Sequence, residues 1–156
     1  MEPLIRLLLS KKWTNLQNRR SGFEDGKYPG VYLLAYSDKA LEGKRINLND
    51  ILYVGMSNSQ SGVKGRLGQF LNSIEKGKGH VAGNRFYKEQ GKGTPFSRMK
   101  NKKRFFMASI SIPCRVKKAE RTPADLRTMG EVLRLEYYVL AHIKEKLHCE
   151  PKWNKK

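Results

Sequence analysis

The sequence is poor in acidic side chains. Its 156 residues include 14 Asp and Glu against 32 Lys and Arg, so the formal net charge at pH 7 is +18. A surface of mixed sign is enough to keep a domain in solution, so an excess of this size predicts a polyanionic partner such as nucleic acid. A basic surface without a specific partner is the alternative.

Cysteine and long apolar runs are also scarce. Cys114 and Cys149 lie far apart and match no metal or redox spacing, so we expect both to be reduced, as is typical of cytoplasmic proteins. The apolar stretch at residues 4–9 is interrupted by Arg6 and followed by two lysines. It is too short to span a bilayer and lacks the cleavage site of a signal peptide, so we expect no membrane span and a cytoplasmic location.

Hydrophobic residues make up 38% of the chain, which is enough for one folded domain over residues 1–156. Apolar residues near helical spacing predict an amphipathic helix over 3–18, within an N-terminal extension at about 1–25. The Gly- and Pro-containing segment 21–30 is predicted to be a loop. No internal repeat or linker divides the chain.

Three short, β-prone runs predict strands at residues 30–36, 51–55 and 104–113. Turn chemistry between such runs favours antiparallel pairing. The apolar spacing in the segment that follows 55 predicts a helix, and a shorter helix is expected at about 83–90. Thr122 is a suitable N-cap before Pro123, so a long helix is predicted from there to about 147.

The first two predicted strands each place a tyrosine near a glycine. Tyr32 follows Gly30 by two residues, and Tyr53 precedes Gly55 by two. A phenol at such a position can reach a ligand, and a glycine lets that ligand approach the backbone closely. Because the chain is strongly basic, we expect the ligand to be an anion.

The long C-terminal helix carries an acidic residue where the pattern calls for an apolar one. Met129, Leu133, Leu140, Ile143 and Leu147 form a stripe, and Glu136 takes its missing position. A buried carboxylate requires a cation or a metal ion. The alternatives are a metal ligand, a Glu paired with an Arg, and a Glu at the edge of the stripe.

Together these residues resemble the GIY-YIG nuclease family. GVY at 30–32 corresponds to its first motif and YVG at 53–55 to its second. Arg66 then occupies the place of the family's helical arginine, Glu136 that of its glutamate, and Asn154 that of its asparagine near the end of the domain. Five elements in order, over nearly the whole chain, make the resemblance specific.

The resemblance implies an α+β fold with a small, mainly antiparallel, three-stranded sheet flanked by helices. It also implies hydrolysis of DNA phosphodiester bonds that depends on a divalent metal ion. The connection from Tyr32 to Tyr53 is longer than in many members. Many members also carry a histidine one helical turn after the arginine, where this chain has Phe70. His80 could supply an imidazole instead, or it could be a histidine in a surface loop.

On this basis Glu136 is expected to hold one Mg²⁺ or Mn²⁺ ion, and Arg66 to clamp phosphate oxygens. Tyr32 is expected to polarise or deprotonate the attacking water. A phenol is a poor base at neutral pH, so a nearby cation such as Arg66 or Lys64 would have to lower its pKa. Tyr53 would contact the phosphate or the water. Asn154 would orient a phosphate, the metal's waters or Tyr32.

A basic segment between the predicted second helix and third strand is expected to contact the DNA backbone. Asn84 and Arg85 could reach base edges. The predicted nucleic-acid contacts are Lys64, His80, Asn84, Arg85, Lys88, Arg98, Lys100, Lys102, Lys103 and Arg104.

Two other functions remain open, a nucleic-acid-binding module without catalysis and a basic RNA-associated protein. The sequence does not decide between restriction, mobile-element transfer and repair. It does not decide between nicking and double-strand cleavage either, and the latter would favour a homodimer.

Overall fold

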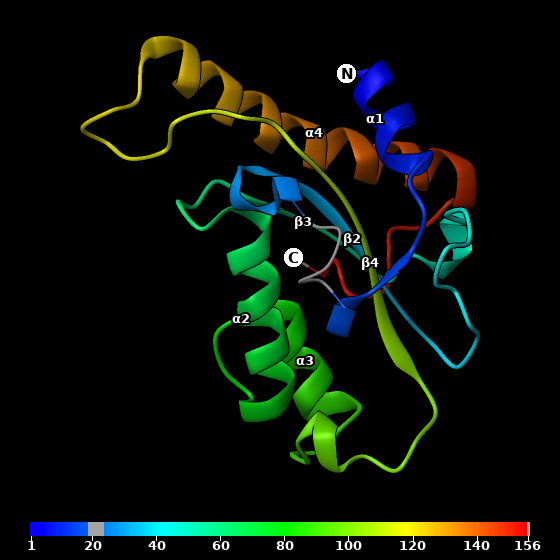
Figure 1. Cartoon of the computed structure of the whole chain (residues 1–156). Helices are drawn as coiled ribbons and strands as arrows, with labels where there is room; N and C mark the ends of the chain where they lie inside the picture. The colour runs from blue at the N-terminus through cyan, green and yellow to red at the C-terminus, as the bar shows by residue number, and fades with distance from the viewer. Residues whose placement is uncertain (19–23, 156) are drawn as a thin grey trace.

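The computed structural model describes residues 1–18 and 24–155. In this part of the chain four antiparallel strands form one sheet in the order β1-β4-β2-β3, with helices on both faces (Figure 1). The strands are β1 (Thr14–Asn15), β2 (Gly30–Ser37), β3 (Tyr53–Ser57) and β4 (Arg104–Ser111). The α-helices are α1 (Glu2–Leu9), α2 (Gly62–Lys76), α3 (Val81–Glu89) and α4 (Pro123–Leu147). Short 3-10 turns lie at Leu16–Asn18, Glu24–Lys27, Leu48–Asp50 and Phe96–Arg98.

The α+β class is confirmed, but the sheet has one strand more than predicted. The single helix predicted over 3–18 is wrong, because α1 ends at Leu9. The backbone of Trp13 then pairs with a distant loop: its N–H donates to the Lys44 carbonyl at 2.9 Å and its carbonyl accepts from the Gly43 N–H at 2.8 Å. This pairing holds the chain extended and brings β1 beside β4. Part of the predicted loop, residues 21–23, lies outside the described residues.

The sheet separates two apolar cores. Alternation along β2 directs Val31, Leu33 and Ala35 to the face covered by α1 and α4. Tyr32 and Leu34 point to the opposite face, which α2 and α3 cover (Figure 1). Side chains from α4 and from α2 can therefore meet only around an edge of the sheet, and β3 is an edge strand.

The buried face of α4 differs in phase from the predicted stripe. The observed face consists of Val132, Leu135, Val139, Leu140 and Ile143. Leu133, which was expected to be buried, is 48% exposed. Glu136 is half-buried, and helical spacing places it on this face, between Ile143 and Leu140.

Among the described residues, no helix combines the length and apolar character needed to cross a bilayer. Cys114 and Cys149 are both free thiols.

Candidate functional site

Two phenols lie side by side at the β3 edge of the sheet. Tyr32 of β2 stands opposite Gly55 of β3, and Tyr53 lies two residues before that glycine on the same face. The centroids of the two tyrosine rings are 6.1 Å apart. Tyr32 has no exposed surface, whereas Tyr53 is half-buried. The sheet therefore places one phenol behind the other, with Tyr53 nearer to solvent.

The two motif glycines admit protein atoms rather than a ligand. A Cβ at position 55 would lie 2.6 Å from the Tyr32 ring and 2.6 Å from the Tyr53 ring. A Cβ at position 30 would lie 2.1 Å from the carbonyl oxygen of Ile110 on the neighbouring strand. The expectation that a ligand approaches these backbones is corrected: Gly55 makes room for the phenols, and Gly30 lets β2 approach β4.

His80 is a buried partner of Tyr32. Its ring has no exposed surface, and Nε2 lies 2.7 Å from the Tyr32 hydroxyl oxygen. Phe70 packs edge-on against the imidazole with ring centroids 5.3 Å apart, at the position where the family resemblance places a histidine. Both the predicted DNA contact and the surface-loop alternative are therefore wrong for His80. The imidazole does reach the site from elsewhere in the chain.

The turn between α2 and α3 fixes the orientation of His80. The buried Ser73 hydroxyl accepts the His80 backbone N–H and donates to the Gln69 carbonyl at 2.8 Å. At the start of α3, the Gly83 N–H points at Nδ1 of the imidazole at 3.5 Å. This contact is long, but a donor there leaves Nδ1 only the role of acceptor. The hydrogen bonds thus assign the ring proton to Nε2, which donates to the Tyr32 oxygen.

Burial dominates the ionisation of these three rings. It lowers the pKa of His80 to about 3, and the positive charge of Arg66 acts in the same direction. Burial raises the pKa of both Tyr32 and Tyr53 above the usual value for a phenol. Arg66 lowers the pKa of each phenol, as predicted, but burial outweighs it. All three groups are therefore neutral at pH 7.

Arg66 and Glu136 reach the phenols from opposite faces of the sheet. Arg66 is half-buried on α2, and its Nη1 donates to Gln69 Oε1 at 2.8 Å. Glu136 comes from α4. The charge of Glu136 raises the pKa of Tyr32 and of Tyr53, while the charge of Arg66 lowers both. The two phenols therefore lie within the electrostatic influence of one acid and one guanidinium.

The C-terminal tail fastens β3 from its open side. The Trp153 N–H donates to the Leu52 carbonyl at 2.9 Å. The side chain of Asn154 then bridges one residue of the strand: Oδ1 accepts from the Val54 N–H at 2.8 Å and Nδ2 donates to the Val54 carbonyl at 2.7 Å. Asn154 was expected to orient a phosphate, a water or Tyr32. It instead fixes the backbone between Tyr53 and Gly55.

Arg85 holds this tail in place. Its Nη1 donates to the Trp153 carbonyl at 2.8 Å, and its Nη2 donates to the Lys155 carbonyl. The guanidinium of Arg85 was expected to reach base edges. It is instead directed to protein carbonyls. Its charge also helps to lower the pKa of Tyr53. Sequence patterns missed this arrangement, because nothing local links a helix residue at 85 to a carbonyl at 153.

The remaining predicted DNA contacts divide by exposure. Asn84 is half-buried, and within the described part of the chain its Oδ1 atom has no hydrogen-bond partner. The exposed cations lie at the start of α2 and from α3 to the start of β4: Lys64, Lys88, Arg98, Lys100, Lys102, Lys103 and Arg104.

Glu136 is the acidic side chain whose charge reaches the phenols. Across residues 1–18 and 24–155, no group of three or more His, Cys, Asp or Glu side chains is arranged to hold a metal ion. A single carboxylate with waters and phosphate oxygens is nevertheless a ligand set that suits Mg²⁺. The site therefore fits an ion that a bound phosphate helps to hold, and not a preformed cage.

No family model matches the chain, and comparison with curated proteins and with solved structures gives no match either. The assignment of a function therefore depends on the geometry of the site and on the motifs.

Proposed function

We propose that this chain is a divalent-metal-dependent DNA endonuclease that hydrolyses phosphodiester bonds. The observation that supports it best is electrostatic: Arg66 and Glu136, from helices on opposite faces of the sheet, both act on a phenol of β2 and a phenol of the edge strand β3. A guanidinium that binds phosphate oxygens and a carboxylate that suits Mg²⁺ are complementary requirements of phosphodiester hydrolysis. The net charge of +18 supplies the attraction to DNA.

In this proposal Arg66 clamps the non-bridging oxygens of the scissile phosphate. Tyr53, the half-buried phenol, hydrogen-bonds the phosphate or the attacking water. Glu136 would hold one Mg²⁺ or Mn²⁺ ion, and such an ion would supply Lewis-acid chemistry and help to the leaving oxygen.

Tyr32 takes a different role from the one predicted, because it has no exposed surface. His80 donates to the Tyr32 oxygen, so the Tyr32 hydroxyl can donate its own proton to Tyr53. The hydrogen bond between the two phenols lowers the pKa of Tyr53. Tyr32 is then a positioning residue that orients the outer phenol. Asn154 fixes β3, the strand that carries Tyr53 and Gly55.

A plasmid-nicking assay tests the proposal. Supercoiled DNA incubated with the purified chain should become relaxed or linear with Mg²⁺ or Mn²⁺ and should stay intact with EDTA. A parallel incubation with structured RNA separates DNA cleavage from an RNA-directed function. Equal or better cleavage of the RNA would contradict the proposal.

A cytoplasmic location, and a homodimer if both strands are cut, belong to the same proposal.

One observation favours a second function, a nucleic-acid-binding module without catalysis. Tyr32 is inaccessible, and burial raises the pKa of both phenols, so neither is a base at neutral pH. In that case the chain binds DNA in a mobility-shift assay but leaves it intact with every divalent ion.

A further inference from the structure

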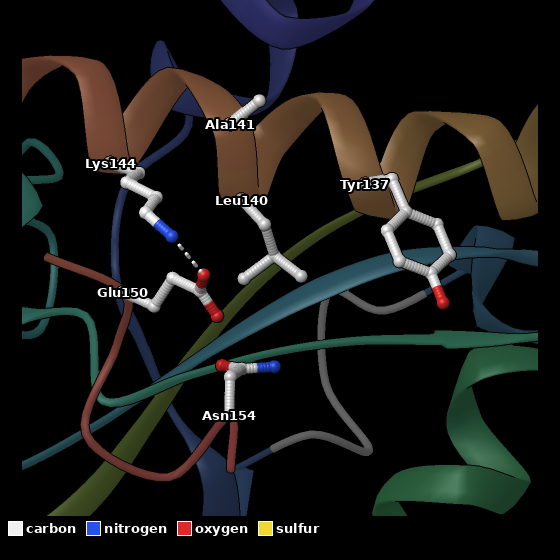
Figure 2. Close-up of a pocket in the computed structure, with 6 residues that line it drawn as sticks. All are labelled: Tyr137, Leu140, Ala141, Lys144, Glu150 and Asn154. Carbon is white, nitrogen blue, oxygen red and sulfur yellow. Dashed lines mark hydrogen bonds and ion pairs between the residues drawn. The ribbon is translucent and has the colours of Figure 1, made fainter. Parts of the chain in front are cut away.

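A hollow lies beside the candidate site, between α4 and the C-terminal tail (Figure 2). Its volume is about 270 Å³. Figure 2 shows Tyr137, Leu140 and Lys144 reaching from the helix toward the tail, which contributes Glu150 and Asn154. The hollow thus has one wall from a regular helix and one from a tail that is fastened to β3.

The residues that line the hollow are neighbours of the proposed catalytic residues along the chain and in the sheet. Tyr137 and Leu140 follow Glu136 by one and four residues on α4, so Leu140 lies one helical turn further along on the same side. On the other wall, Asn154 is bonded to the backbone of Val54, next to Tyr53. The nucleotide next to a phosphate bound at Glu136 would therefore lie near the hollow.

The lining suits a flat group with apolar faces and polar edges. Tyr137 is 51% exposed and Leu140 is apolar, which together offer a stacking and packing surface. At the far end, the Lys144 ammonium lies 2.8 Å from Glu150 Oε1, so a donor and an acceptor stand side by side. Each atom of the Asn154 carboxamide can make a second hydrogen bond besides the one to Val54.

These properties distinguish among the parts of a nucleotide. A phosphate would gain nothing from the apolar wall, and the Lys144 ammonium that could attract it is already paired with Glu150. A nucleobase uses both its faces and its edges. The volume is slightly below the range of about 300–1,000 Å³ that holds drug-sized ligands, so it fits one small ring system.

We propose that this hollow receives one unpaired nucleobase from the strand that is cut, next to the scissile phosphate. The inference rests on the proposed function and names its substrate class. A base must leave the duplex stack to enter, and this costs a few kcal/mol, least when the nucleotide is already unpaired. DNA with a bulged or mismatched nucleotide is therefore the preferred substrate.

The test measures binding rather than cleavage. Fluorescence anisotropy in EDTA, at one fixed salt concentration, compares a paired duplex with the same duplex carrying one bulged nucleotide. The wild-type chain should bind the bulged duplex about tenfold more tightly, in line with the value of stacking one base on an aromatic ring. Tyr137→Ala should lose this preference, and Tyr137→Phe should keep it.

Tyr138→Ala is the matched control. Tyr138 is 45% exposed on the same helix, but it does not line the hollow, and its ring lies under Arg134 at 5.5 Å. This variant should keep the preference for the bulged duplex. Equal affinity of the wild-type chain for both duplexes, or equal loss in the two alanine variants, would overturn the inference.

Nicking with Mg²⁺ is scored separately. Cleavage without any preference for the bulged duplex refutes the base-binding hollow and leaves the endonuclease intact. A preference for the bulged duplex that depends on Tyr137, without cleavage in any divalent ion, supports the base-binding hollow and refutes the endonuclease.

Discussion

The Tyr32 hydroxyl oxygen lies 2.7 Å from His80 Nε2, and neither side chain has exposed surface. Because the Gly83 N–H occupies Nδ1, the imidazole donates and the phenol accepts. A buried polar group that loses its partner costs about 1–3 kcal/mol. The pair of Tyr32 and His80 therefore stabilises the fold and also fixes the orientation of the Tyr32 hydroxyl.

Tyr32→Phe should abolish most cleavage while DNA affinity stays close to that of the wild type. The substitution removes the hydroxyl that orients Tyr53 but touches no exposed surface. It should also lower the free energy of unfolding by about 1–3 kcal/mol, because Nε2–H of His80 is left unpaired. Single-turnover rates and DNA affinities are compared at a temperature where both proteins are folded. Unchanged turnover would remove Tyr32 from the mechanism.

The stability of the fold should decrease as the pH falls below about 6.5, and His80 should account for part of the decrease. The unfolded chain protonates His80 near its ordinary pKa of 6.5, whereas burial holds the pKa in the fold at about 3. The contribution is therefore present above pH 6.5 and is lost as pH falls through that window toward 3. It amounts to about 2 kcal/mol between pH 7 and pH 5.

His80→Asn provides the control for this pH effect. Asparagine does not titrate and is a good N-cap for α3. Urea unfolding of this variant should show a pH dependence that is flatter by about 2 kcal/mol over the same interval. An equal slope in both proteins would show that His80 is not held neutral by the fold.

Gly55→Ala should destabilise the fold by about 1–3 kcal/mol, because the new Cβ enters the space of two phenol rings. Gly68→Ala is the matched substitution. Position 68 lies within α2, and a Cβ there would meet no atom of the described residues within 4 Å beyond its own stretch of helix, so alanine should stabilise by up to about 1 kcal/mol. Thermal unfolding of the pair measures both effects. Equal behaviour of the two variants would mean that the Tyr32 and Tyr53 rings can move aside.

Much of the fold follows from local patterns. The strand predicted at 30–36 is observed, and the one predicted at 51–55 is displaced by two residues. The capping signal of α4 is confirmed, because Thr122 Oγ1 accepts from the Asp125 N–H at 3.3 Å and the Asp125 carboxylate accepts from the Thr122 N–H at 2.7 Å. β1 could not be predicted, since it depends on pairing between Trp13 and a loop thirty residues away.

Some residues of the site could likewise be predicted from local patterns, and others could not. Motif spacing singled out Tyr32, Tyr53, Arg66 and Glu136, and in the fold the charges of Arg66 and Glu136 act on both phenols. The stripe that singled out Glu136 was out of phase with the buried face of α4, because Leu133 is exposed. The burial of His80 could not be predicted from the local sequence, because it depends on the close approach of α2 and α3 at Ser73.

Asn154→Asp should release the edge strand. The carboxylate can still accept from the Val54 N–H, but it places a negative charge against the Val54 carbonyl, where the amide donated at 2.7 Å. Loss of that hydrogen bond should cost about 1–3 kcal/mol and should speed amide hydrogen exchange along β3. Exchange rates at Val54 are the direct readout. Protection equal to that of the wild type would show that the tail does not hold the strand.

The central claim is that one carboxylate at the β3 edge serves phosphodiester cleavage, and a pair of substitutions on α4 tests it most directly. Glu136→Gln removes the proposed metal ligand, while Glu145→Gln removes the same charge from an exposed position further along the helix. The measurement is the single-turnover rate of plasmid nicking with saturating Mg²⁺. We predict that Glu136→Gln loses at least about a hundredfold in rate, equivalent to about 2.7 kcal/mol, while Glu145→Gln cuts like the wild type. Equal rates in the two variants would contradict the account.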